Sequence, residues 1–523
     1  MDFSKTILGI ELGSTRIKGV LIDENHQVIA SGSYGWENKL ENGVWTYELA
    51  DAVKGVQACF AELKADAEAK FGKPLSTVGA IGISGMMHGY LVFDKAGKQL
   101  APFRTWRNTI TAQASQALTE LFRFNIPQRW SIAHLYQAIL NKEDHVAAIG
   151  KLTTLSGYIH YLLTGNYAMG IDEASGMFPY DDEIVDFDKA RVAQFDDLIA
   201  SYGFPWKLCE ILPQVLRAGE CAGKLTEEGA KLLDPTGTLQ PGIPMCPPEG
   251  DAGTGMVATG AVHPRTGSIS AGTSAFSLQV LERPLKGYYP QIDVCCTPGG
   301  KTVAMAHCNN CTSDIDAWVG LFADTAKVLG FEVSMNDLYG KLFRAALEGE
   351  ADCGGIVAIN YLAGEHLTET EVGRPMVVRL PGAKMTVPNF MRAQLNAAIS
   401  TLRLGMQMLR EKENVESDML LGHGGFFKTP GVGQQILANA LNVPISVMET
   451  AGEGGPWGMA LLAAYMVRKE AGETMEDYLK NKVFADAKSI SVAPDAAGVA
   501  GFEAYLTRYK AALAAEKTAA AMK

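Results

Sequence analysis

Residues 6–22 read Thr-Ile-Leu-Gly-Ile-Glu-Leu-Gly-Ser-Thr-Arg-Ile-Lys-Gly-Val-Leu-Ile, with a Gly-Ser-Thr turn between two apolar segments. A third apolar segment, Val28-Ile-Ala30, follows after a short polar stretch. Apolar runs rich in β-branched residues and separated by short polar turns are typical of antiparallel strands. Residues 6–30 are therefore predicted to form a β-meander.

The same pattern returns in the second half of the chain. Residues 266–281 read Thr-Gly-Ser-Ile-Ser-Ala-Gly-Thr-Ser-Ala-Phe-Ser-Leu-Gln-Val-Leu, again two strands around a tight turn. Gly13 and Gly272 are 259 residues apart in a chain of 523, close to half its length. This spacing favours an internal duplication. The alternative is a chance match between two common Gly-Ser/Thr turns.

The elements that follow each meander also agree. In the first half, apolar residues at helical spacing between Leu49 and Leu63 precede a buried-type strand at 78–83. In the second half, the same spacing from Leu395 to Leu409 precedes a strand at 419–422. Each half thus predicts hairpin, helix and parallel strand in a mixed α/β sheet, with an insertion at 310–390 in the second. The predicted domains are 1–260 and 261–523, facing a central cleft.

Composition excludes several functional classes. Lys and Arg number 46 against 58 Asp and Glu, a net charge of −12, which disfavours a nucleic-acid binder. No apolar run approaches membrane-spanning length and no secretory signal is visible, so the chain is predicted to be soluble and cytoplasmic. Nine cysteines include Cys308 and Cys311 after His307, a spacing that allows structural zinc. Reduced, mostly buried thiols are the favoured interpretation.

The two glycine turns suit phosphate binding. Gly13, Ser14 and Thr15, with Arg16 beside them, offer backbone N–H groups, hydroxyls and a cation, and Gly272-Thr273-Ser274 offers a second such turn. Two turns across a cleft suit a polyphosphate, whereas a single turn would more simply be a tight hairpin. The chain has no GxxxxGK[ST] motif, which excludes the P-loop class.

Two further glycine-rich segments carry candidate chemistry. Gly422-His-Gly-Gly425 lies between a predicted strand and a predicted helix and would seat an adenosine group, or would simply be a tight strand-to-helix turn. Glu249-Gly-Asp-Ala-Gly-Thr-Gly255 places Asp251 among glycines. A carboxylate held in this way could accept the proton of an alcohol during phosphoryl transfer. Its alternative role is to cap a helix that starts near Gly253.

Together these motifs resemble the FGGY family of carbohydrate kinases along essentially the whole chain. The resemblance implies an α/β fold of two duplicated ribonuclease H-like domains, as in actin, hexokinase and the heat-shock chaperone ATPases. It implies ATP and Mg²⁺ as cofactors, and it assigns the general-base role to Asp251. Residues 450–458 match a Gly/Ala-rich segment that opens a late helix. The ATP contacts it implies are Gly13, Ser14, Thr15, Arg16, Gly272, Thr273, Ser274, Gly424, Gly425, Phe426 and Gln434.

The sugar side resembles the xylulokinase branch of that family. Gly82-Ile-Ser-Gly-Met-Met-His-Gly89 matches a pattern in which Met87 and His88 contact a ketopentose, although a histidine in such a place is more often a satisfied loop residue. Trp106 and Arg107 match a segment that lines the sugar side, and Asp172 matches a residue of the cleft that binds the sugar. In the implied site, Asp251 also touches the sugar.

Two positions and one segment depart from the family pattern. Glu11 replaces the usual Asp of the first loop, and its longer side chain is expected to meet Mg²⁺ through water; Asp251 is the second residue expected to meet the metal. Met86 replaces a Gln before the Met-His pair. Residues 424–430 have the spacing of ribulokinases, not xylulokinases. We give the sugar loop more weight, because it touches the group that varies among substrates.

The resemblance implies a kinase that phosphorylates the C5 hydroxyl of a ketopentose, with D-xylulose as the first candidate, and it favours a homodimer. Within the class, the alternatives are L-ribulokinase and other ketose kinases. An actin-like nucleotide switch with no sugar product is the rival from another class. An inactive sensor, in which Glu11 prevents metal use, is the third interpretation.

Overall fold

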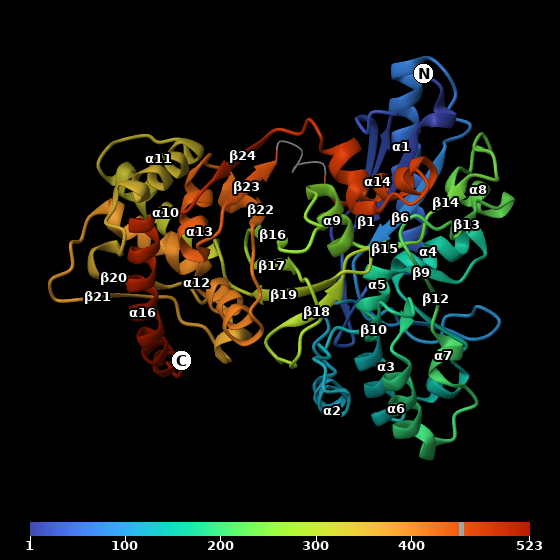
Figure 1. Ribbon diagram of the computed structural model, residues 1–523, viewed down its shortest axis with the longest axis horizontal. Helices are drawn as coiled ribbons and strands as arrows, with labels where there is room; N and C mark the ends of the chain where they lie inside the picture. Colours follow the sequence, from blue (N-terminus) through green and yellow to red (C-terminus); the bar gives the residue numbers. More distant parts are fainter. Residues whose placement is uncertain (449–453, 523) are drawn as a thin grey trace.

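The computed structural model describes residues 1–448 and 454–522. Two α/β halves lie side by side, with the amino-terminal half on the right and the second half on the left (Figure 1). Each half contains a seven-stranded mixed sheet. Among the described residues, no helix has both the length and the apolar character required to cross a bilayer.

The first sheet has the order β13-β14-β6-β1-β2-β3, with β15 also paired to β6. Its strands are β1 (Ile7–Leu12), β2 (Arg16–Ile22), β3 (Val28–Gly35), β6 (Ala80–Gly85), β13 (Gly223–Lys224), β14 (Pro244–Met245) and β15 (Glu249–Gly250). β1 pairs antiparallel with β2 and parallel with β6, and β2 pairs antiparallel with β3. Helix α1 (Leu49–Phe71) packs on β3, because its apolar residues recur on one face.

The second sheet repeats this arrangement in the order β18-β19-β17-β16-β22-β23-β24. Its strands are β16 (Thr266–Ala271), β17 (Ala275–Val280), β18 (Asp293–Cys296), β19 (Thr302–Cys308), β22 (Met419–His423), β23 (Ile445–Met448) and β24 (Ser489–Val492). β16 pairs antiparallel with β17 and parallel with β22, and β17 pairs antiparallel with β19. The order β3-β2-β1-β6-β14 therefore reappears as β19-β17-β16-β22-β23, which confirms the predicted duplication.

The remaining elements surround these two sheets. In the first half they are β4 (Lys39–Glu41), β5 (Val44–Thr46), β7 (Leu91–Phe93), α2 (Ala112–Phe122), α3 (Ser131–Leu140), β8 (Lys151–Thr153), α4 (Leu155–Thr164), β9 (Ala168–Gly170), α5 (Ile171–Ser175), β10 (Tyr180–Asp181), β11 (Asp186–Phe187), α6 (Lys189–Ile199), α7 (Leu208–Ile211), β12 (Gln214–Leu216), α8 (Glu227–Leu233) and α9 (Asp251–Thr259). In the second half they are α10 (Ser313–Val328), α11 (Met335–Glu348), β20 (Ile356–Ile359), β21 (Met376–Arg379), α12 (Val387–Glu413), α13 (Val432–Leu441), α14 (Gly454–Arg468), α15 (Met475–Tyr478) and α16 (Ala496–Ala519). α10, α11, β20 and β21 occupy the predicted insertion.

Helix α14 belongs to the second half along the chain but packs on β1, β2 and β6 of the first sheet and on α9. A Cβ at Gly9 would lie 2.2 Å from the carbonyl oxygen of Pro456, and one at Gly82 would lie 2.7 Å from Met459 Cε. Glycine at these strand positions lets the helix approach closely. One buried core is consequently built from both halves.

Candidate active site

Asp251 stands at the point where β15 passes into α9. It is the first residue of that helix, and Gly250 is the N-cap. Its Oδ1 accepts a hydrogen bond from the backbone N–H of Met87 at 3.1 Å, which ties it to the predicted sugar loop. The side chain reaches solvent. The protein atoms packed around it nevertheless displace water from the carboxylate, and this desolvation raises its pKa. Asp251 is therefore an accessible carboxylate of increased basicity.

Asp172 lies behind this helix and not in an open cleft. Its side chain is fully buried, and its Oδ2 accepts from the backbone N–H of Gly253 at 3.0 Å. A Cβ at Gly253 would lie 2.5 Å from Asp172 Cγ, so the carboxyl fills the space that this glycine leaves. Sequence reasoning placed Asp172 against the sugar, but its burial instead gives it the role of holding the first turn of α9.

Two more buried carboxyls lie in the same region and were not predicted. Glu173 and Glu249 are both almost completely buried, and Glu249 Oε2 accepts from the backbone N–H of Glu173 at 3.3 Å. Burial raises both pKa values well above the ordinary value. Burial thus favours the protonated, neutral form of each, and they add little negative charge beside Asp251. Both acidic residues were visible in the sequence, but nothing there marked them as buried.

Glu11, on β1, points toward the start of α14. A Cβ at Gly455 would lie 1.5 Å from Glu11 Oε2 and 3.2 Å from Thr254 Oγ1, which places the carboxylate between α9 and α14. Burial, and next the Asp251 charge, raise the pKa of Glu11 to about 7. A pair of interacting carboxylates fits a divalent cation that completes its shell with water and phosphate oxygens. No cluster of three or more candidate metal ligands occurs within residues 1–448 and 454–522.

The two predicted phosphate turns are rigidly held. Gly13 N–H donates to Arg16 O at 3.1 Å, and the carbonyl of Gly13 accepts from Trp36 Nε1 at 2.7 Å. In the second turn, Gly272 N–H donates to Ser274 O at 2.9 Å. The turn side chains remain accessible, with Thr15, Arg16 and Thr273 exposed and Ser14 and Ser274 half-buried. Hydroxyls and a cation are thus available to a ligand on fixed backbone.

The third glycine loop follows β22 and rests on the second turn. Gly424 has φ +103°, and a Cβ there would lie 2.5 Å from the carbonyl oxygen of Ala271. Gly425 borders open space. Phe426, in contrast, is completely buried in the core of the second half. Gln434 is also buried. Its side-chain amide is fully engaged within the protein, because it accepts from Gly431 N–H at 2.8 Å and donates to Ile490 O at 3.0 Å. The side chains of Phe426 and Gln434 therefore serve the fold. Within this loop, the residues still expected to contact the nucleotide are Gly424 and Gly425.

On the sugar side, Met87 and His88 follow β6. His88 Nδ1 lies 3.0 Å from the carbonyl oxygen of Gly176, which can only accept, so Nδ1 carries the proton. Burial, and then Arg129, lower the pKa of His88 to about 3. The ring is consequently neutral, and Nε2 is an acceptor with no protein partner among the described residues. This satisfies one ring nitrogen, as for a loop histidine, and leaves the other for a ligand hydroxyl.

Trp106 and Arg107 lie beside the first phosphate turn. Trp106 is 40% exposed, and the Arg107 guanidinium stacks over Trp45 at 3.8 Å. Together with Ser14 and Thr15 they line an open cavity of about 820 Å³. The predicted sugar-side and phosphate-side residues thus border one space.

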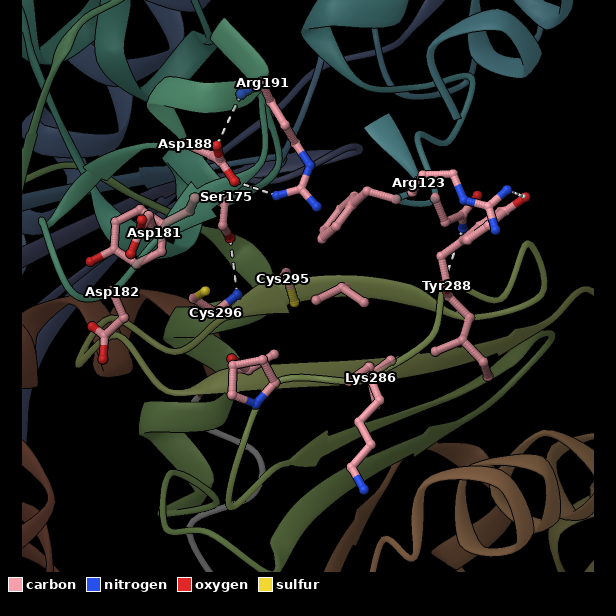
Figure 2. Close-up of a pocket in the computed structure, with 18 of the residues that line it drawn as sticks. Arg123, Ser175, Asp181, Asp182, Asp188, Arg191, Lys286, Tyr288, Cys295 and Cys296 are labelled. Atoms are coloured by element: carbon pink, nitrogen blue, oxygen red, sulfur yellow. Dashed lines mark hydrogen bonds and ion pairs between the residues drawn. The ribbon is translucent and has the colours of Figure 1, made fainter. Parts of the chain in front are cut away.

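The two halves also meet behind Asp172. A cavity of about 630 Å³ has one wall from the first half and one from β18 and the segment before it. Figure 2 shows Ser175, on α5, whose Oγ accepts from the backbone N–H of Cys296 at 2.9 Å. Ser175 Oγ in turn donates to the carbonyl oxygen of Asp172 at 2.7 Å. Strand β18 is therefore connected through α5 to the residue that holds α9.

Comparison with known proteins gives consistent results. Residues 6–257 match the N-terminal domain and residues 267–467 the C-terminal domain of the FGGY family of carbohydrate kinases. A xylulose kinase of Haemophilus influenzae is 23% identical over 86% of this chain and 89% of its own, and one of Lactococcus lactis is 21% identical over 95% and 94%. A solved xylulose kinase from Brucella ovis has a TM-score of 0.78 at 20% identity, covering 98% of this chain and 99% of that one. A gluconate kinase from Lactobacillus acidophilus has the same TM-score at 18% identity, covering 99% and 98%. The duplicated fold, the two predicted phosphate turns and Asp251 thus stand in a chain that belongs to the FGGY family of carbohydrate kinases.

Proposed function

We propose that this carbohydrate kinase transfers the γ-phosphoryl group of ATP to the C5 hydroxyl of D-xylulose. The observation that carries the proposal is the placement of Asp251. Its accessible carboxylate is hydrogen-bonded to Met87 of the sugar loop, and it is close enough to Glu11, beside the first phosphate turn, to raise the pKa of that residue. One group thus faces both the acceptor side and the phosphate side.

In this mechanism Asp251 accepts the proton of the hydroxyl as its oxygen bonds to the γ-phosphorus. The bond from that phosphorus to the bridging oxygen of ADP breaks, and the electron pair leaves with ADP. Burial brings the pKa of Asp251 nearer to neutral pH, where a general base is most effective. The turns at 13–16 and 272–274 orient the phosphates, and the loop at Gly424 and Gly425 borders the adenosine. Mg²⁺, held through water by Glu11 and Asp251, would neutralise charge on the transferring phosphates.

The acceptor is selected by the sugar loop. His88 Nε2 accepts a hydrogen bond from a sugar hydroxyl, since its ring is neutral and its other nitrogen is protonated. Trp106 covers one face of the sugar, and Arg107 lies beside it. The names of the similar kinases favour D-xylulose. L-ribulose and other ketoses are the alternatives. Of these, L-ribulose is supported by the ribulokinase-like spacing of residues 424–430.

ADP release across a panel of acceptors tests the substrate. The panel contains D-xylulose, L-ribulose, L-xylulose, D-ribulose, glycerol and gluconate, and we expect the highest kcat/KM with D-xylulose. ATP hydrolysis that no sugar stimulates would instead favour a nucleotide switch. Sugar binding without turnover would favour the inactive sensor.

Asp251→Ala tests the general base. We expect the rate to fall about 10²- to 10⁴-fold while the affinity for ATP is retained. Turnover at the wild-type rate would refute the role of Asp251. The proposal also includes two domains, residues 1–260 and 261–523, and a homodimer. Sedimentation equilibrium tests the homodimer.

A further inference from the structure

Strand β18, at the edge of the second sheet, contacts the first half at both of its ends. At Cys296 it bonds to Ser175, as described above. At Asp293, its first residue, it forms an ion pair with Arg129 of the first half. Asn125 Nδ2 donates to Asp293 Oδ1 at 2.8 Å and to the carbonyl oxygen of Ile292 at 3.1 Å. The segment 125–129 therefore binds the start of β18 through two side chains.

The same segment holds the sugar loop. The carbonyl oxygen of Arg129 accepts from the backbone N–H of Gly89 at 3.4 Å, and Ser131 Oγ donates to Gly89 O at 2.5 Å. Gly89 directly follows Met87 and His88, and its φ of +103° belongs to a region that glycine adopts readily. A sugar that displaces this loop would consequently displace residues 129–131.

Strand β18 leads to the nucleotide side. It pairs with β19, which pairs with β17, whose first residue follows the turn at 272–274. His307 on β19 reaches solvent, yet the protein atoms around its ring displace water and lower its pKa; Arg129 lowers the pKa next, while Asp293 opposes the shift. Asp293 pairs with Met305, two residues from His307, so His307 lies on the face of β19 that carries the Arg129–Asp293 pair, and the sheet connects that pair to the second predicted phosphate turn.

We propose that Arg129 and Asp293 are positioning residues that couple acceptor binding in the first half to nucleotide binding in the second. The side chains are 25% and 18% exposed, so this pair is less screened by water than a surface ion pair. It joins the loop that meets the sugar to the sheet that carries the phosphate turn. A ligand that displaces the sugar loop therefore changes the free energy of nucleotide binding at the phosphate turn. The coupling is reciprocal, so the nucleotide changes the free energy of sugar binding by the same amount.

The test rests on the proposed function, because it uses D-xylulose as the acceptor. The affinity of a non-hydrolysable ATP analogue is measured by calorimetry with and without D-xylulose in the wild type, in Arg129→Met, in Asp293→Asn and in the double variant. We expect D-xylulose to tighten binding of the analogue about five-fold or more in the wild type. The ratio should approach one in each single variant, and the double variant should resemble either single one, because the residues act through each other.

Arg191→Met is the matched control. Arg191 pairs with Asp188 at nearly the same exposure, 27% and 18%, but both residues belong to the first half. This variant should keep the wild-type ratio, and Arg129→Lys should restore part of it. In a wild type that phosphorylates D-xylulose, a ratio near one would overturn the inference, and so would an unchanged ratio in Arg129→Met and Asp293→Asn. Failure of D-xylulose to be phosphorylated is a separate result and contradicts only the proposed substrate.

Discussion

Replacing Glu11 with Gln tests the electrostatics of the site through protein stability. The pKa of Glu11 is raised from 4.5 to about 7, first by burial and then by Asp251. A carboxyl whose pKa is raised by folding favours the folded state below its unfolded pKa, and this advantage is lost as the pH rises toward its folded pKa. The wild type therefore loses stability between pH 4.5 and 7, whereas the Glu11→Gln variant has no group to ionise at this position and loses none.

Without screening by solvent, the raised pKa of Glu11 corresponds to about 3 kcal/mol in the free energy of unfolding once the carboxyl is ionised in both states. Glu11 is partly exposed, so screening by solvent reduces this value to about 1–2 kcal/mol at pH 8, and to about a quarter of that at pH 5. For a domain of this size, about 1 kcal/mol changes Tm by about 2–4 °C. We therefore expect Glu11→Gln to raise Tm by about 2–8 °C at pH 8 and by about 0.5–2 °C at pH 5.

The measurement is thermal unfolding followed by fluorescence, in EDTA, at both pH values. Glu37→Gln, an exposed carboxylate of the same half, should give equal Tm changes at the two pH values. Adding Mg²⁺ should raise the Tm of the wild type more than that of the Glu11→Gln variant, since the cation relieves the repulsion. A Tm change that is the same at pH 5 and pH 8, or larger at pH 5, would refute the reasoning.

Three further substitutions test the remaining parts of the site and the core. Gly424→Ala must place a side chain at φ +103° and against a strand carbonyl; we expect KM for ATP to rise about ten-fold, with little change in Gly425→Ala, and equal effects would contradict this. His88→Phe removes the Nε2 acceptor and should raise the acceptor KM about ten-fold with an unaltered ATP KM; an unchanged acceptor KM would argue against a sugar contact. Lys64→Met leaves Asp234 buried without its 2.9 Å ion pair, and the free energy of unfolding measured in urea should fall by about 3–5 kcal/mol; a loss below about 1 kcal/mol would show the pair to be dispensable.

Local patterns predicted most of the fold. Apolar runs around Gly-Ser-Thr turns predicted β1–β2 and β16–β17, and helical spacing predicted α1 and α12, because both halves bury one face of each element. The predicted helix beginning near Gly253 starts at Asp251. The Ala- and Lys-rich stretch that follows Tyr505, whose composition predicts a helix, belongs to α16, which begins at Ala496. The first part of the 450–458 segment lies outside the described residues, and α14 begins at Gly454.

The site was less predictable, because contacts between distant segments leave little trace in local sequence. Asp172 was visible as an acidic residue, but only the fold shows that Gly253 leaves space for its carboxyl. Phe426 and Gln434 follow a nucleotide-type glycine loop, yet packing directs both inward. The Arg129–Asp293 pair joins residues with no shared motif. The glycine loops remain the sequence's prediction of where ligands approach, whereas the sequence could not separate buried from accessible side chains within those loops.

The crossing of α14 onto the first sheet has a consequence for biosynthesis. β1 and β6 leave the ribosome early, but the helix that covers them is among the last segments to be translated. At ~5–20 residues per second this leaves an apolar sheet face bare for tens of seconds. Nascent chains of this kinase should therefore bind chaperones until synthesis is nearly complete. A messenger truncated before codon 454 should yield an aggregating fragment, which a separately expressed C-terminal half could rescue by supplying the missing helix in trans.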